Sequence, residues 1–188
     1  MQDNYDLSEL DVLLIDSNKH MRLIARSILH SFGCKSVREY DNAASALEEI
    51  RHYNVDIIIV SWLLEPINGL EFVKLMRTGK DSPNVYVPII MMSSRCEYQQ
   101  VIDAREAGTN EFLAKPISPQ MLYQRIQSLI GNPRPFINSA RYFGPCRRRR
   151  HLGPPQGVAE RRKGNPVVVD GEGLDAGDDP ASVDTEAR

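Results

Sequence analysis

The sequence has few cysteines and no long apolar segment. Cys34, Cys96 and Cys146 form no C-x-x-C pair, and the four histidines are scattered, so no metal site is predicted. Unpaired thiols suit a reducing compartment better than a disulfide framework. No stretch approaches the roughly 18 apolar residues of a membrane span, and the acidic N-terminus lacks the apolar core of a signal peptide. These absences predict a soluble, cytoplasmic protein.

Charge is distributed unevenly along the chain, although the formal net charge is only −2. Residues 1–130 carry 13 Lys/Arg and 17 Asp/Glu, residues 131–163 carry 9 and 1, and residues 164–188 carry 1 and 7. Prolines become frequent beyond residue 131 and apolar residues become rare, so this part buries too little surface to offset the entropy of ordering. The pattern predicts an N-terminal extension (1–8), one domain (9–131) and a disordered tail (132–188), with a basic part (134–163) and an acidic part (170–186).

Short apolar runs alternate with helical patterns through the first 130 residues. The runs lie at 12–15, 36–40, 56–60, 88–92 and 111–114, and residues 56–60 are β-branched after the opening aspartate. Ser118 and Pro119 have the residue types that open a helix. Five strand–helix units in about 120 residues predict an α/β fold, a doubly wound five-stranded parallel sheet with helices on both faces. Such sheets bind ligands at the carboxyl ends of their strands.

Polar residues stand directly after four of the five predicted strands. They are Asp16 and Ser17 after the first strand, Ser61 after the third, Ser93 after the fourth, and Lys115 with Pro116 after the fifth. Each pair alone is a weak signal, but together and in this order they are specific. The carboxyl ends of the strands therefore predict a site made of Asp16, Ser17, Ser61, Ser93 and Lys115.

On these residues the segment from about 11 to 130 resembles the receiver domains of two-component response regulators, whose fold is flavodoxin-like. The resemblance places Asp16 in the first acidic pair, Ser93 at the hydroxyl position, Lys115 at the phosphate-contacting lysine and Phe112 at the switch aromatic. It also implies a phosphoacceptor aspartate eight residues before the glycine of Asn68–Gly69. That position is Ser61.

Two of the three carboxylates that the family uses are therefore replaced by serine, at Ser17 and Ser61. The family's remaining metal contact is a backbone carbonyl, which would fall at Leu63. Mg²⁺ needs one or two carboxylates beside a phosphate, so binding of Mg²⁺ is expected to be weak or absent, and no other cofactor and no catalytic residue is predicted. We expect Lys115 to pair with Asp16, with Ser17 and Ser61 donating hydrogen bonds.

The leading hypothesis is a stand-alone pseudo-receiver of a phosphorelay, a protein-binding module that works without phosphorylation and is not an enzyme. Its partner would be a histidine kinase or a downstream effector. One alternative is a response regulator controlled by modification at Ser61. Another is a polyanion-binding protein that uses an arginine cluster for nucleic acid or lipid; no DNA-reading module fits in the remaining residues. The cluster consists of Arg147, Arg148, Arg149 and Arg150.

Overall fold

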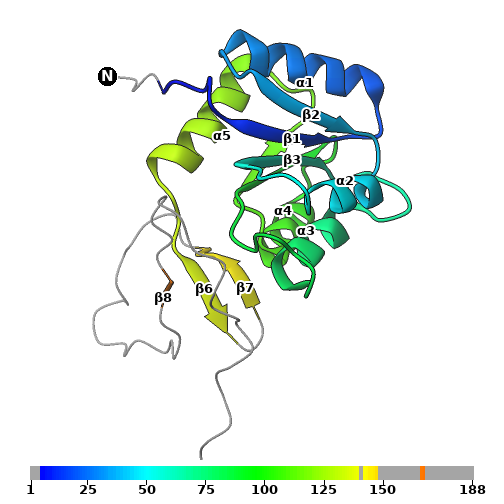
Figure 1. The fold of residues 1–188 in the computed structure, drawn as a ribbon. Helices are drawn as coiled ribbons and strands as arrows, with labels where there is room; N and C mark the ends of the chain where they lie inside the picture. Colours follow the sequence, from blue (N-terminus) through cyan, green and yellow to red (C-terminus); the bar gives the residue numbers. More distant parts are fainter. Residues whose placement is uncertain (1–4, 140–141, 148–165, 168–188) are drawn as a thin grey trace, which may run out of the picture.

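A five-stranded parallel sheet forms the centre of the computed structural model, which describes residues 5–139, 142–147 and 166–167. Its strands are β1 (Asp11–Ile15), β2 (Ser36–Tyr40), β3 (Ile57–Ser61), β4 (Ile89–Ser93) and β5 (Glu111–Ala114). All neighbours pair in parallel, in the order β2-β1-β3-β4-β5 (Figure 1). The prediction of a doubly wound five-stranded sheet with flavodoxin-like topology is confirmed.

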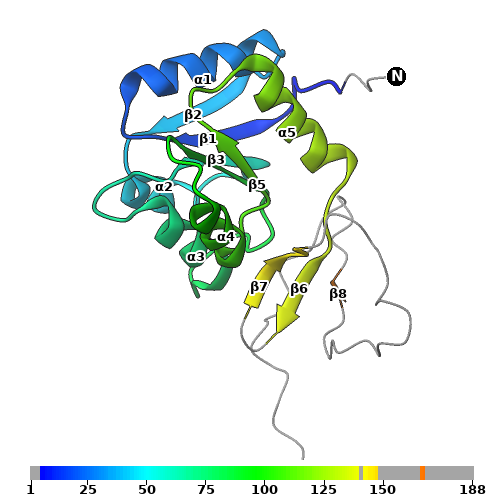
Figure 2. The same ribbon diagram turned by 180° about the vertical axis from the view of Figure 1, so that it is seen from behind.

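Helices cover both faces of this sheet (Figures 1 and 2). They are α1 (Lys19–Ser31), α2 (Ala43–Glu49), α3 (Gly69–Thr78), α4 (Tyr98–Ala107) and α5 (Pro119–Gly131). Buried residues of α2, α3 and α4 share one apolar cluster, and those of α1 and α5 share the other. The core is therefore divided into two layers by the sheet.

The central strand β3 shows why this sequence builds two apolar layers. All five of its residues are buried, and its side chains alternate between the faces as the period of a strand requires. Ile58 and Val60 join the α2–α3–α4 layer, whereas Ile57 and Ile59 join the α1–α5 layer. A strand buried on both faces needs a continuous apolar run, which is the pattern seen in the sequence.

The N-terminal segment contributes to the core. Leu7 is 1% exposed and packs in the same apolar layer as α1 and α5, with Tyr5 against its edge. The predicted extension over residues 1–8 therefore includes a residue that the domain buries.

The C-terminal part begins with an ordered hairpin. Strands β6 (Phe136–Ser139) and β7 (Tyr142–Pro145) pair antiparallel, and β8 (Pro166–Val167) pairs with the other side of β6. The prediction of disorder from residue 132 is corrected for these residues. The aromatic side chains that order the hairpin find their partners far away in the sequence, so no local pattern announces them. Residues 148–165 and 168–188, with Arg148, Arg149, Arg150 and the acidic stretch, lie outside the described residues.

Candidate functional site

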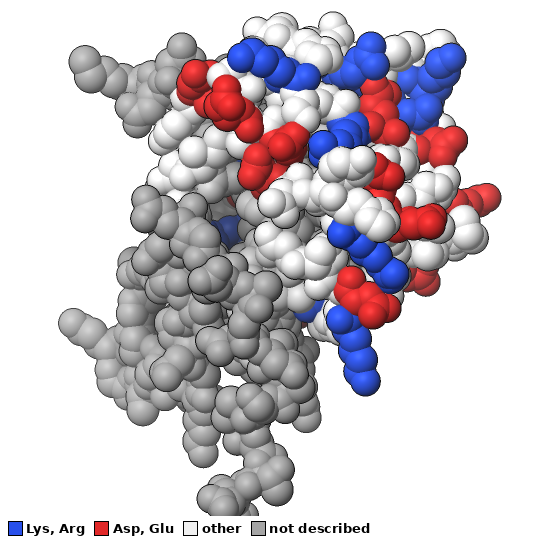
Figure 3. Space-filling view, in the orientation of Figure 1, with Lys and Arg blue, Asp and Glu red and all other residues white. Residues whose placement is uncertain are grey.

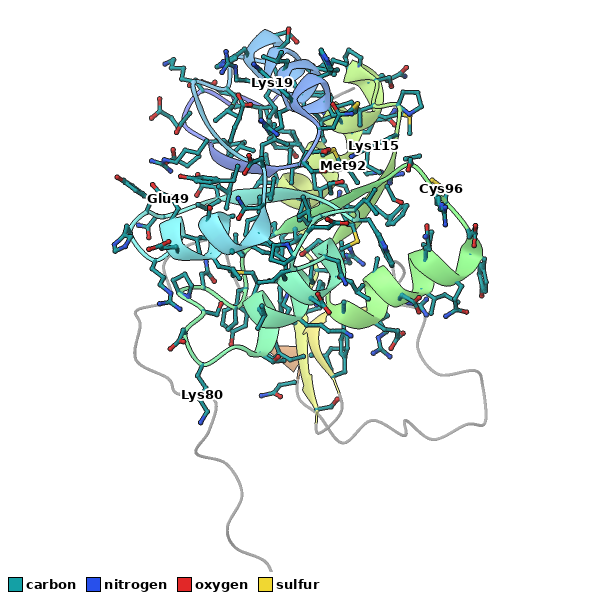
Figure 4. The ribbon with its side chains drawn as sticks, turned by 90° about the vertical axis from the view of Figure 1, so that its right-hand side faces the viewer. Lys19, Glu49, Lys80, Met92, Cys96 and Lys115 are labelled. Carbon is teal, nitrogen blue, oxygen red and sulfur yellow. The ribbon has the colours of Figure 1, made fainter. Side chains whose placement is uncertain are left out.

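The carboxyl ends of four neighbouring strands bring the predicted site residues to one edge of the sheet. Asp16 follows β1, Ser61 ends β3, Ser93 ends β4 and Lys115 follows β5. Figure 4 shows Lys115 beside Met92, the β4 residue that is paired with Ser61. The strand order β1-β3-β4-β5 therefore places residues that are up to 99 positions apart in one pocket.

A lysine-centred network fills this pocket. The Lys115 Nζ lies 2.5 Å from Asp16 Oδ2 and 2.9 Å from Ser61 Oγ. Asp16 and Ser61 are each 1% exposed, and the side chain of Lys115 is 14% exposed. The second carboxylate oxygen of Asp16 accepts the backbone N–H of Asn18 at 3.0 Å. Both oxygens of the only carboxylate in the network are thus already bound to donors.

Ser17 does not join this network. It is exposed, and its hydroxyl donates to the backbone carbonyl of Leu63 at 3.3 Å. The expectation that both serines donate within the pocket needs two corrections. Ser17 bonds to the loop after β3, and Ser61 accepts a hydrogen bond from Lys115, because an ammonium group has donors only.

Ser93 and Phe112 lie on the neighbouring strands β4 and β5. Ser93 is 4% exposed, and its hydroxyl accepts the backbone N–H of Arg95 at 3.1 Å. Phe112 is half-buried on β5 and packs against the α2–α3–α4 layer. The Ser93 carbonyl also accepts the backbone N–H of Lys115 at 2.8 Å. The ends of β4 and β5 are therefore joined at the residue that carries the lysine.

The turn before α3 packs directly against the acceptor position. Asn68 caps α3 in a capping box with Glu71, and the Gly69 N–H donates to the carbonyl of Trp62 at 3.0 Å. A Cβ on Gly69 would collide with the carbonyl oxygen of Ser61. Only glycine fits at this position, which gives a physical reason for a glycine eight residues after position 61. The Lys115–Pro116 and Glu65–Pro66 peptide bonds are both cis.

Arg22 is a site residue that the sequence analysis missed. Its guanidinium donates to the backbone carbonyls of Asp16, at 2.6 Å, and Ser17, at 3.3 Å, and lies 3.6 Å from the Glu39 carboxylate of β2. Arg22 therefore holds the loop between β1 and α1 in place. The only sequence feature that points to this role is the position of Arg22, one turn after the start of α1.

The donor set does not fit Mg²⁺. A hard divalent cation needs carboxylate oxygens, whereas Asp16 is held by Lys115, and Ser17 and Ser61 supply neutral hydroxyls. The Leu63 carbonyl accepts the Ser17 hydroxyl. Across the residues that the structure describes, no group of three or more His, Cys, Asp or Glu side chains is placed to hold a metal ion.

The basic cluster is only partly within the described residues. Arg147 forms an ion pair with Glu106, and its guanidinium stacks on the ring of Tyr142 at 3.8 Å from the centroid. Arg148, Arg149 and Arg150 lie outside the described residues. Within the described ranges, no helix is both long enough and apolar enough to cross a bilayer.

Comparisons with known proteins agree on this fold. Residues 12–127 match the family model described as "Response regulator receiver domain". The chain is 30% identical over 123 residues to the chemotaxis protein CheY1 of Helicobacter pylori, covering 65% of this chain and 98% of that protein. Among solved structures, the chemotaxis response regulator CheY4 of Vibrio cholerae aligns with a TM-score of 0.58 at 23% identity, covering 64% of this chain and 98% of that chain. The CheX–CheY–BeF₃–Mg²⁺ complex of Borrelia burgdorferi also aligns, with a TM-score of 0.58 at 21% identity, covering 64% and 89%.

Proposed function

The chain belongs to the response regulator receiver domain family of two-component signalling, and we propose that it binds its protein partner without phosphorylation of its pocket. The observation that carries the proposal is the closed network of Asp16, Lys115 and Ser61. In this network the lysine already has an anionic partner inside the domain. No phosphoryl group is needed to neutralise it.

Ser61 is poorly placed to accept a phosphoryl group. A serine hydroxyl is a weak nucleophile unless a base takes its proton. The group bound to Ser61 Oγ is the Lys115 ammonium, which donates, and the oxygens of Asp16 are bound to Lys115 and to the Asn18 N–H. We therefore assign the domain no catalytic residue and no enzymatic activity of its own.

The partner would be a signalling protein, a histidine kinase or a downstream effector. Receiver domains bind such proteins, and the Borrelia burgdorferi relative was solved as a CheX–CheY complex. In this chain, α4 and α5 flank β5 and leave apolar side chains at the surface, with Tyr98 82% exposed and Met121 36% exposed. We propose this surface as the docking face and the cytoplasm, where three free thiols are stable, as the compartment.

Incubation with acetyl phosphate and Mg²⁺, followed by intact-mass measurement, tests the proposal. The expected result is no mass increase on the wild-type chain. A variant with Ser17→Asp and Ser61→Asp, which restores the family's carboxylates, serves as the positive control. A labile adduct of one phosphoryl group on the wild type would refute the proposal.

Control by a kinase that modifies Ser61 is the first alternative. Ser61 is 1% exposed and lies beneath the turn of Gly69, so a kinase would need the pocket to open. Phosphopeptide mapping of protein isolated from cells distinguishes this alternative from the leading proposal, because only the alternative predicts a stable phosphate at Ser61.

Polyanion binding is the second alternative. On the face shown in Figure 3, basic and acidic side chains alternate over the described part of the domain, so that face offers no continuous basic patch. Arg147, the described member of the arginine cluster, is already paired with Glu106. A salt-dependent gel shift that disappears when residues 148–163 are deleted would favour this alternative over the leading proposal.

A further inference from the structure

The β6–β7 hairpin lies beyond the family match, which ends at residue 127, yet it packs on the receiver fold. Figure 2 shows it beside the lower ends of α3 and α4. Phe136 and Phe143 contact Tyr86, in the segment before β4, with ring centroids 5.1 Å and 5.5 Å from that of Tyr86. Phe136 is 4% exposed. Edge-on aromatic contacts at these distances are favourable, so the hairpin has an apolar anchor on the domain.

The hairpin also contacts the C-terminal end of α4. The two backbones are so close that a Cβ on Gly144 would lie 2.9 Å from the Cα of Gly108, the residue that caps α4 with φ of 100°. Arg147 pairs with Glu106 of α4 and stacks on Tyr142. The last turn of α4 is thus held by close backbone packing and by an ion pair.

A buried guanidinium connects the hairpin with three elements of the domain. Arg77 of α3 is 2% exposed and donates to Gly108 O at 2.9 Å, Val85 O at 2.8 Å and Asn110 Oδ1 at 2.9 Å. These acceptors are neutral, and burial lowers the pKa of Arg77 to about 9. The ring of Phe136 lies 5.2 Å from its guanidinium carbon. The hairpin therefore helps to cover a charge that α3, the end of α4 and the start of β4 share.

A second connection lies at the start of β5. The Glu111 side chain is 3% exposed, and it lies 3.2 Å from Arg125 of α5 and 3.7 Å from Arg134, in the segment that leads to β6. Removing one partner from a buried ion pair is costly. The C-terminal segment is thus tied both to the end of α4 and to the beginning of the next strand.

Helix α4 packs along α3, but the side chains that it buries are small. Its buried residues are Ala104 and Ala107, its N-cap Glu97 makes no side-chain capping bond, and Tyr98 and Val101 are 82% and 38% exposed. By contrast, α3 buries a phenylalanine and a methionine and begins with a capping box. Alanines bury little apolar area, and elements with few buried contacts open first. The position of α4 therefore depends strongly on contacts at its C-terminal end.

We propose that residues 132–139 and 142–147, the C-terminal strap, hold α4 and the start of β5 in one position. The strap acts at the starts of β4 and β5, whereas the pocket lies at their carboxyl ends. Its contacts reach Arg77, Glu106 and Glu111, and none of them involves Ser61. The proposed docking face is thereby set by an intramolecular contact, and this inference holds whether or not the pocket accepts phosphate.

Gly144→Val in the full-length chain tests the strap, because the valine side chain would collide with the Tyr142 hydroxyl and with the Cα of Gly108. Two readouts are recorded on the same samples: alkylation of each cysteine, mapped by peptide, and amide hydrogen exchange. Cys146, 5% exposed at the end of the hairpin, reports undocking, and buried Cys34 reports global unfolding. Asn138→Val is the matched control, because it adds the same branched side chain to a residue exposed in the hairpin.

We expect Gly144→Val to speed alkylation of Cys146 and exchange of the α4 amides each by about tenfold or more. Cys34 alkylation and exchange in β3 stay at the wild-type rate, and Asn138→Val changes nothing. If Cys146 is exposed while α4 exchange is unchanged, the strap does not hold α4. If Cys34 and β3 respond in step with α4, the hairpin stabilises the whole domain and the proposal is also wrong.

Phe143→Ser is an independent substitution that removes the ring contact with Tyr86 and does not crowd the backbone. The same pattern is expected, with Cys146 and α4 affected together. Protection of Cys146 in both variants would show that these contacts do not dock the hairpin, and that result would overturn the inference.

Discussion

Restoring the missing carboxylates is the most direct test of what the pocket lacks. The double variant Ser17→Asp, Ser61→Asp would add a second carboxylate beside the ammonium of Lys115 and a third on the neighbouring loop, where the wild type has Asp16 alone. The formal charge of these four side chains changes from 0 to −2, which a divalent cation would neutralise. The variant with Ser61→Asp alone restores the acceptor carboxylate but still lacks the second acid at position 17. Comparing it with the double variant therefore distinguishes the effect of the acceptor from that of the metal site.

Coulomb energies indicate how each variant should behave without metal. A carboxylate about 3 Å from the Lys115 ammonium gains roughly 5 kcal/mol at an effective dielectric constant of 20, and its repulsion from Asp16 at about 5 Å costs roughly 3 kcal/mol. The net Coulomb gain of about 2 kcal/mol is offset by the cost of desolvating another buried carboxylate, so the single variant should fold with about the wild-type stability. A further carboxylate at position 17 adds repulsion, and the nearby Arg22 guanidinium is already bound to the Asp16 and Ser17 carbonyls and lies beside the Glu39 carboxylate. The double variant should therefore be destabilised until metal binds.

Thermal unfolding with and without Mg²⁺, at matched ionic strength, measures this difference. Mg²⁺ at about 100 times its Kd would stabilise the double variant by about 2.7 kcal/mol, which corresponds to an increase in Tm on the order of 10 °C. The wild type should show no increase beyond that caused by salt. Acetyl phosphate should then add one phosphoryl group to the double variant and none to the wild type.

Two results would refute the reasoning. A rise of several degrees in the Tm of the wild type with Mg²⁺ would show that Asp16 alone suffices for metal binding. A Ser61→Asp variant that phosphorylates as fast as the double variant would show that the second acid is dispensable. In either case the paired loss at Ser17 and Ser61 would not explain the pocket.

Three further variants test single contacts. Lys115→Met leaves the Asp16 carboxylate buried and unpaired, and urea titration should show a loss of about 3–5 kcal/mol; adding Asp16→Asn should recover part of it. Gly69→Ala should lower the unfolding free energy by about 1–3 kcal/mol, because its Cβ collides with the Ser61 carbonyl. A decrease too small to measure would contradict the close approach of Gly69 to that carbonyl. Tyr142→Phe should cost about 1 kcal/mol at neutral pH by removing the hydrogen bond that its hydroxyl donates to the Pro145 carbonyl. Because burial raises the pKa of Tyr142, the neutral phenol stabilises the fold below pH 10 and this advantage declines as the pH rises above that, so the gap should narrow in alkaline buffer.

Much of the fold could be predicted because its signals are local. The β-branched run at residues 56–60 marks the central strand, and the Ser118–Pro119 pair marks the start of α5, where the Ser118 side chain accepts the N–H of Met121. The site could be located because parallel strands bring their carboxyl ends together. The Lys115–Asp16 contact follows from this arrangement and from the cost of leaving a buried lysine unpaired.

The remaining features depend on long side chains and on contacts between distant residues. Arg22 reaches the Asp16 carbonyl from α1, and the Ser17 hydroxyl bonds to the Leu63 carbonyl. No sequence pattern indicates either contact. Prolines around the short strands of the hairpin make its sequence look like that of a disordered segment. Its order comes instead from Phe136 and its aromatic neighbours, one of which lies 50 residues earlier at Tyr86.

The close approach of Gly144 to Gly108 has a consequence for biosynthesis. Every residue of the parallel sheet leaves the ribosome before β7, which follows the end of α4 by more than 30 positions. At roughly 5–20 residues per second, about 2–7 seconds pass between the synthesis of α4 and the synthesis of the C-terminal strap. Translation pauses after α5 would lengthen that interval, and a ribosome stalled there would display a sheet that is complete but a helix that is still loosely held.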